Sequence, residues 1–271
     1  MNPLNRFSHL TLSFSEDSDI ATLEMAPKDK PCFTQSLLSE IKQAQNIIDF
    51  RCSRYLIFSS ALEGIFNYGG DVGNFRKYIL QKDYTALYDY MEACIDVLHP
   101  NFTNTDVFRV AVVQGAAYGG GFEAALCCDR IIAEKQARFA FPELKFNLFP
   151  GMGAYTYISR KTSLAVTDKI VQSGSVFSAQ ELLDLGVVDE VVDDNEGITA
   201  AHEYIRQHKR HYNGYNALRD VANVIKPLTR EELMKIGKIW VEYALNISPR
   251  DLRLMDSIAK TQQKNVAAKH S

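Results

Sequence analysis

The chain has 271 residues, 46% of them hydrophobic, which is enough for the core of one large domain or of a domain with an appendage. Its formal net charge is −3, so it carries no electrostatic signature of nucleic-acid binding. No apolar run reaches the roughly 20 residues that span a bilayer, and residues 1–14 lack the apolar core of a signal peptide. The five cysteines lack CxxC spacing, and Cys127 and Cys128 are adjacent in an apolar helical pattern. They indicate buried reduced thiols and a cytoplasmic protein rather than a disulfide or a metal site.

Strands and helices are predicted to alternate along most of the chain. Residues 9–26 alternate apolar and polar on both sides of a polar turn, which predicts a β-hairpin. Helical spacing covers 33–50, a buried strand covers 54–60, and a long helix is predicted over 75–98, ended by Pro100. The later elements are predicted as a strand at 107–115, two short strands within 130–141, a helix containing 163–174, and a helix and a strand separated by Gly186 within 178–192.

From about residue 198 the pattern is helical, broken at Pro227 and Pro249. Strands that alternate with helices indicate the α/β class, and the tail indicates a helical appendage.

The most informative stretch is GAAYGGGFEAALCCDR, residues 115–130. A predicted strand turns here through glycines into a predicted helix. Backbone N–H groups at the start of a helix lack partners within it and lie at the positive end of the helix dipole. The turn therefore suits a phosphate or an oxyanion.

Three interpretations of this turn compete. A dinucleotide fold needs G-x-G-x-x-A with Glu143 as the ribose-binding acid, but the motif lies in mid-chain and Glu143 follows a proline. Tight helix–strand packing is a second reason for glycine. An oxyanion hole is the third, and it demands a second N–H donor from another loop. Gly69 and Gly70 precede Asp71, whose side chain can cap the next helix, so this loop qualifies.

These motifs resemble the crotonase superfamily of enoyl-CoA hydratases and isomerases. The resemblance rests on VAVVQGAAYGGGFEAALCCDRIIA, on ARFAFPELKFNLFPGMGA and on IFNYGGDVGNF, and it covers roughly residues 7–192. It implies an α/β spiral of repeated ββα turns with a helical C-terminal region. The expected division is a catalytic core at 1–197 and a helical region at 198–271 that closes the acyl pocket and forms the oligomer interface. The resemblance implies that the backbone N–H groups of Gly70 and Gly120 form the oxyanion hole.

Two glutamates match the catalytic pair of the family's hydratases, Glu123 and Glu143. Glu123 lies one turn into the helix that follows the glycines, and Glu143 has apolar neighbours. Burial and a second acid nearby favour the neutral form of a carboxyl, so two such groups can divide acid and base roles near neutral pH. A surface salt bridge for Glu143 and a dipole-stabilising role for Glu123 are the alternatives. Having both residues favours adding or removing water across the α,β carbons of a thioester.

Three further features resemble the diffusible signal factor synthases of bacterial quorum sensing. They are FNLFPGMGAY, the GGD loop with its later Phe75, and a tail with one tryptophan and RDLRLMD. The resemblance implies dehydration of a 3-hydroxyacyl group on acyl carrier protein (or coenzyme A) to a cis-2-enoyl thioester. It also implies hydrolysis to a free cis-2-unsaturated fatty acid, with no metal or redox cofactor. The partners it implies are a second and third copy of the chain, as a trimer or a dimer of trimers, and the receiver domain of a sensor kinase, which can hold such a synthase inactive.

An acyl tail needs an apolar pocket. Trp240, which has apolar neighbours at helical spacing, is the first candidate, followed by Met152 and Ile258; plain core packing is the alternative for all three.

Other polar residues are expected to be structural. Asp129 is predicted to cap a helix or to pair near Arg130. His202, His208 and His211 are predicted to lie on a solvated helix face, with no metal site.

Two other functions remain open. One is a conventional trans-2-enoyl-CoA hydratase. The other is a non-catalytic regulatory module on the same fold, against which the presence of both glutamates argues.

Overall fold

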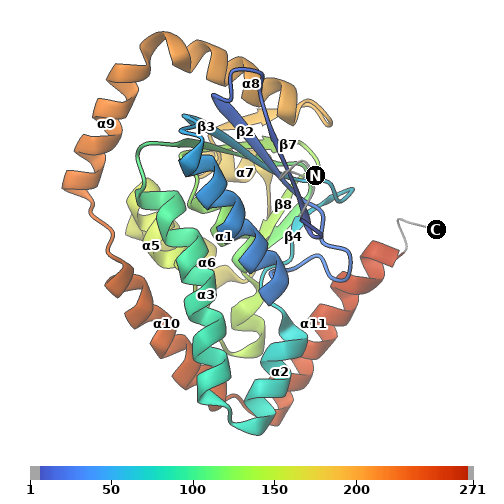
Figure 1. Ribbon diagram of the computed structural model, residues 1–271. Helices are drawn as coiled ribbons and strands as arrows, with labels where there is room; N and C mark the ends of the chain where they lie inside the picture. The colour runs from blue at the N-terminus through green and yellow to red at the C-terminus, as the bar shows by residue number, and fades with distance from the viewer. Residues whose placement is uncertain (1–6, 268–271) are drawn as a thin grey trace.

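A spiral of strands and helices builds two sheets, one large and one small. The computed structural model describes residues 7–267 (Figure 1), so the ends of the two expected regions, 1–6 and 268–271, lie outside the described residues. The large sheet has the order β1-β2-β3-β5-β7-β10 and the small sheet β4-β6-β8-β9. The strands are β1 (Leu10–Phe14), β2 (Ile20–Met25), β3 (Tyr55–Ser60), β4 (Ile65–Asn67), β5 (Phe108–Val113), β6 (Ala116–Tyr118), β7 (Arg130–Glu134), β8 (Arg138–Ala140), β9 (Val176–Ser178) and β10 (Glu190–Val192).

Each turn of the spiral places one strand in each sheet. β3 and β4, then β5 and β6, then β7 and β8 follow one another in the chain, the first of each pair in the large sheet and the second in the small one. Among the strands of the described residues, only β1 with β2 and β8 with β9 pair antiparallel. The α/β class and the ββα repetition predicted from the sequence are confirmed, as is the N-terminal hairpin.

Helices cover both sides of the large sheet (Figure 1). The helices that connect successive strands pack on one side and contribute to the main hydrophobic core. On the other side, α8 packs on β3, β5 and β7 through Ala201 and Ile205. The helices are α1 (Gln35–Phe50), α2 (Val72–Gln81), α3 (Tyr84–Thr103), α4 (Gly120–Leu126), η2 (Pro142–Phe146), α5 (Ala154–Lys161), α6 (Leu164–Ser173), α7 (Ala179–Asp184), α8 (Gly197–His208), η3 (Lys209–His211), α9 (Tyr212–Ile225), α10 (Arg230–Leu245) and α11 (Pro249–Ala267).

The C-terminal helices return to the body of the protein. α10 packs against α3, and α11 packs against α2 and η2. In Figure 1, α9 runs along one side of the molecule and connects α8 to α10. Within residues 7–267, no helix is both long enough and apolar enough to cross a membrane.

The long helix predicted over 75–98 is wrong in two respects. It is two helices, because Lys82 adopts a left-handed φ of 54° that ends α2, and the side chain of Asp83 accepts the N–H of Ala86 to start α3. Pro100 does not end α3, which continues to Thr103. A proline in the last turn removes only one hydrogen bond of the helix, so the helix tolerates it there.

Candidate active site

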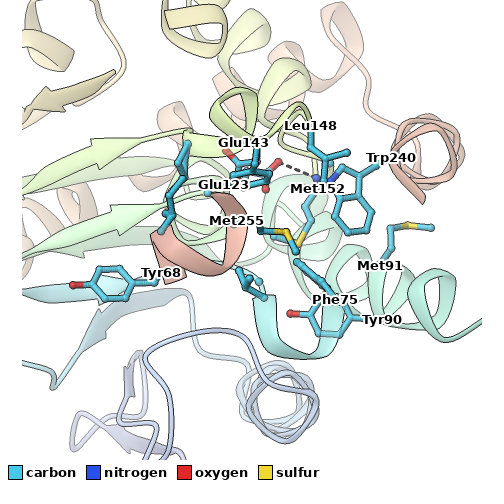
Figure 2. A pocket seen from close by; sticks show the side chains of 18 residues that line it. Tyr68, Phe75, Tyr90, Met91, Glu123, Glu143, Leu148, Met152, Trp240 and Met255 are labelled. Atoms are coloured by element: carbon cyan, nitrogen blue, oxygen red, sulfur yellow. Dashed lines mark hydrogen bonds between the residues drawn. The ribbon is translucent and has the colours of Figure 1, made fainter. Parts of the chain in front are cut away.

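A largely apolar pocket lies where the spiral meets the C-terminal helices. Its walls come from α2, α3, α4, η2, the loop at 148–152, α10 and α11 (Figure 2). All seven residues singled out from the sequence line it: Gly70, Gly120, Glu123, Glu143, Met152, Trp240 and Ile258. The pocket therefore brings together residues from both sides of the boundary expected at 197.

Two glycine turns meet at this pocket, the first at residues 68–70 and the second at residues 118–120. Their backbones are in contact, because a Cβ on Gly69 would stand 2.6 Å from the nitrogen of Gly120. Gly69 and Gly119 also have φ values of 86° and 50°, which L side chains rarely adopt. Glycine is thus required here both by conformation and by the close approach of the two turns.

Each turn opens a helix. Asp71 begins α2, and its carboxylate accepts the N–H groups of Gly73 and Asn74, as predicted from the sequence. The same carboxylate forms a salt bridge with Lys30 at 2.9 Å, which ties the end of the first turn to the loop that precedes α1. Gly120 is the first residue of α4, so its amide belongs to the positive end of that helix.

Glu123 is buried, with 1% of its surface exposed. Its Oε1 accepts hydrogen bonds from the backbone N–H groups of Met152 (Figure 2) and Ala154, both at 2.9 Å. Burial raises the pKa of this carboxyl to about 7, and the backbone donors oppose the rise because they stabilise the charged form. The loop at 150–154 thus holds the carboxylate in one orientation.

Glu143 lies opposite, at the start of η2, and is half-buried. Its Oε2 is buried and has no hydrogen-bond partner among the described residues, and its Oε1 would lie 2.5 Å from a Cβ on Gly119. Burial raises the pKa of this carboxyl to about 8, and the negative charge of Glu123 adds to the rise. The surroundings of Glu143 therefore favour the neutral carboxyl, whereas the backbone donors to Glu123 favour its charged form.

Away from the glutamates the pocket is apolar. The ring of Trp240 packs on Gly151, where a Cβ would stand 2.5 Å from the indole, and its centroid is 5.1 Å from that of Phe75. Met91 from α3 and Met255 from α11 complete this end. Such a lining suits an apolar part of a ligand.

The sequence analysis missed part of the lining. Tyr68, Phe75, Tyr90, Met91, Leu148 and Met255 also face the pocket. Most of them lie on helices whose apolar spacing is equally consistent with core packing, so the sequence held no separate signal for them. Tyr68 is different, because Tyr-Gly-Gly occurs at residues 68–70 and again at 118–120.

Two structural predictions need correction. His208 does not lie on a solvated face: it is 1% exposed, its Nδ1 is 3.1 Å from the Tyr55 hydroxyl, and burial lowers its pKa to about 4. It follows Ala201 and Ile205 on the side of α8 that packs on the large sheet. His202 and His211 are exposed, as predicted.

Asp129 is structural, but its partner is not Arg130. Its carboxylate pairs with Arg219 at 2.9 Å and accepts the backbone N–H of Arg109 at 2.7 Å. Arg130 pairs with Glu190 instead. Cys127 and Cys128 are buried free thiols, as predicted, and among residues 7–267 no group of three or more His, Cys, Asp or Glu side chains could hold a metal ion.

Two glycine turns beside a pair of acids, in a spiral of ββα units, are the arrangement expected of an enzyme of the crotonase type. The family model for enoyl-CoA hydratase/isomerase matches residues 16–235, and the chain belongs to this family. Enzymes of the family act on coenzyme A thioesters without a cofactor and commonly form trimers.

Relatives of known name agree with this placement. The carnitinyl-CoA dehydratase of Salmonella typhimurium is 38% identical over 98 residues, which are 36% of this chain and 38% of that protein. The match thus spans well under half the length of such relatives.

Solved structures share the fold. Enoyl-CoA hydratase from Bacillus halodurans has a TM-score of 0.79 at 20% identity and covers 92% of this chain and 100% of its own. Human mitochondrial delta3-delta2-enoyl-CoA isomerase has a TM-score of 0.75 at 17% identity, covering 97% and 98%. Pseudomonas aeruginosa DspI has a TM-score of 0.63 at 22% identity, covering 82% of each chain.

Proposed function

We propose that the protein dehydrates a 3-hydroxyacyl thioester to a cis-2-enoyl thioester and then hydrolyses it to the free fatty acid, as a diffusible signal factor synthase. The observation that carries the dehydration is the pair Glu123 and Glu143. The two carboxyls line one pocket, beside two glycine turns, and differ in which protonation state their surroundings favour.

In the first step the thioester oxygen binds the N–H groups of Gly70 and Gly120. Loss of the α-proton converts the carbonyl to an enolate, and the two amides stabilise the charge that develops on oxygen. Each donor of this kind is worth about 3 kcal/mol in acyl-transfer enzymes.

The glutamates move the protons. The charged carboxylate removes the α-proton, the neutral carboxyl protonates the 3-hydroxyl, and the C3–O bond breaks to release water. The pair ends with the proton on the other member, so one proton transfer between the two restores the starting state. A positioned acid or base contributes about 10²–10⁴-fold.

The hydrolysis uses the same oxygen site. Water, deprotonated by a glutamate, attacks the thioester carbon and forms a tetrahedral oxyanion between the two amides. Collapse breaks the C–S bond, the thiolate takes up the proton, and the free acid leaves. The sequence features shared with the signal factor synthases, which extend to the tail at 250–256, are the support for this second step.

The remaining parts of the proposal concern the surroundings of the reaction. The acyl tail occupies the end formed by Trp240, Met152 and Ile258, and acyl carrier protein delivers it. A receiver domain that restrains the enzyme and a reducing cytoplasm belong to the same proposal, the latter supported by the free cysteines.

A conventional trans-2-enoyl-CoA hydratase is the second candidate. It is favoured by the family match over residues 16–235, and it would use the same two glutamates. It requires no thioester cleavage.

Mass spectrometry of the products separates the two candidates. The protein is incubated with 3-hydroxyacyl groups of several lengths on carrier protein and, in parallel, on coenzyme A. Release of free cis-2-enoic acid supports the synthase. A reversible mixture of hydroxyacyl and trans-enoyl thioesters without free acid contradicts the synthase and supports the hydratase, and no conversion of any thioester contradicts both.

A further inference from the structure

The same three residues, Tyr-Gly-Gly, form both glycine turns. Tyr68 directly follows β4, and Tyr118 is the last residue of β6. A helix starts within a few residues of each tyrosine. Because β4 and β6 are parallel neighbours in the small sheet, the two tyrosines come to the same edge of that sheet.

The hydrogen-bonded ladder between β4 and β6 does not reach the two tyrosines. The pairing of β4 with β6 ends at Asn67 and Ala117, with a register shift between Ile65 and Asn67. Beyond this point β6 continues to pair with β8, through Tyr118 and Ala140. The first turn, at residues 68–70, therefore begins where the pairing of β4 with β6 has ended.

On the side away from β6, backbone hydrogen bonds hold the first turn: the N–H of Tyr68 donates to Pro31, and the N–H of Phe33 donates to Gly69. Toward the second turn, the tyrosine rings contact each other beside the glycine backbones. Their centroids are 5.5 Å apart and their planes differ by 12°, so the rings are stacked. Both side chains are half-buried, and burial raises the pKa of Tyr68 to about 12. On the other side of the backbone, Gly69 contacts the carbonyl oxygen of Tyr118.

The stack lies away from the acyl end. In Figure 2, Tyr68 lies on the opposite side of the view from Trp240 and Met91. Tyr68 lines the pocket, whereas Tyr118 is not among the residues that line it. Any effect of Tyr118 on the pocket must therefore be transmitted by Tyr68 or by the turn at residues 118–120.

We propose that the Tyr68–Tyr118 stack is a positioning device that fixes the first glycine turn against the second and so sets the spacing of the Gly70 and Gly120 amides. The expected effect on catalysis rests on the proposed function, whereas the coupling between the two turns does not. Two preorganised donors act only when both lie within reach of one oxygen, and a misplacement of about 1 Å can lower a rate 10²-fold.

The kinetic test compares Tyr118→Phe with Tyr118→Leu. Phenylalanine keeps the stack without the hydroxyl, and leucine removes the stack. We expect Tyr118→Leu to lower kcat about 10- to 100-fold with a smaller change in KM, and Tyr118→Phe to restore most of the loss. Tyr84→Leu is the control, because Tyr84 stacks on Tyr88 at 5.9 Å outside the pocket and should leave kcat unchanged.

Two kinetic results would overturn the inference. If Tyr118→Phe is impaired as strongly as Tyr118→Leu, the hydroxyl matters and not the stack. If Tyr118→Leu raises KM and leaves kcat unchanged, the pair contacts substrate instead of positioning the turns.

Hydrogen–deuterium exchange tests the same inference without any substrate. Tyr118→Leu should speed exchange at 68–71, in the other turn, and Tyr118→Phe should not. Tyr68→Leu should have the reciprocal effect at 118–121 and serves if Tyr118→Leu does not fold. Unchanged exchange in both turns refutes the positioning device, even if the enzyme is active. Coupled exchange in a protein that converts no thioester refutes the proposed function and leaves the device standing.

Discussion

The surroundings of two side chains of one chemical type favour opposite protonation states in this pocket. Glu123 receives two backbone N–H groups, which stabilise its charge, whereas Glu143 has an unpartnered oxygen and faces the charge of Glu123. The sequence could predict that both residues matter, from a first-turn position and an apolar neighbourhood. It could not predict their order of protonation, because the donors to Glu123 come from Met152 and Ala154, far along the chain.

This order predicts a bell-shaped pH profile of kcat/KM. The productive free enzyme has Glu123 charged and Glu143 neutral. As the pH falls below about 7, Glu123 takes up a proton and the base is lost; as it rises above about 8, Glu143 loses its proton and the acid is lost.

The rate should fall about tenfold per pH unit on each side of a maximum between these values. Steady-state kinetics from pH 5 to 10 measure it, with circular dichroism as a check that the protein stays folded. A profile that is flat from pH 5 to 7 would contradict the assignment of a raised pKa to Glu123.

At the scale of elements, most features set by neighbouring residues were predicted from the sequence, and features set by distant contacts were not. The N-terminal hairpin and the Asp71 cap follow from neighbouring residues, and both were predicted. The break at Lys82 was missed because a non-glycine left-handed residue leaves no clear mark in a sequence. The burial of His208 was missed because it depends on where α8 packs, although its spacing from Ala201 and Ile205 marks one helix face.

α9 shows how tertiary contacts override local pattern. It buries no residue, yet Arg219 extends from it into the body of the protein. The guanidinium pairs with Asp129 and donates to the carbonyl oxygens of Thr105 at 2.8 Å and Val107 at 2.9 Å. One side chain thus supplies much of the attachment of this helix.

Arg219→Met should therefore destabilise the protein by about 3 kcal/mol, because it leaves a partly buried carboxylate and several carbonyls without their donor. The expected fall in Tm is roughly 5–10 °C by thermal denaturation. Arg206→Met is the matched control, since Arg206 forms an exposed pair with Glu203 and should change stability by less than about 0.5 kcal/mol. Equal effects of the two substitutions would contradict the anchoring role.

At the scale of the whole molecule, the spiral leaves one apolar helix face uncovered. Leu218, Val221 and Ile225 on α9 are 65%, 52% and 69% exposed and follow one another at helical spacing. An apolar row of this kind is typical of an interface, and the family commonly forms trimers.

We expect light scattering to give the mass of a trimer or a dimer of trimers. The double substitution Leu218→Glu and Ile225→Glu should shift the mass toward the monomer, because it places charges in an apolar contact. Phe50→Glu, at a still more exposed position at the end of α1, should leave the mass unchanged. A wild-type protein that is monomeric at every concentration tested would refute the interface.

The most direct test of the acid–base pair is the dehydration rate of Glu123→Gln and Glu143→Gln. Glutamine keeps the size of the side chain and removes the ionisable carboxyl group, so each variant should lose about 10²–10⁴-fold in kcat while remaining folded. Glu63→Gln, at an exposed position away from the pocket, should retain the wild-type rate. If either pocket variant turns over 3-hydroxyacyl thioester as fast as Glu63→Gln, the two carboxyls do not perform the chemistry.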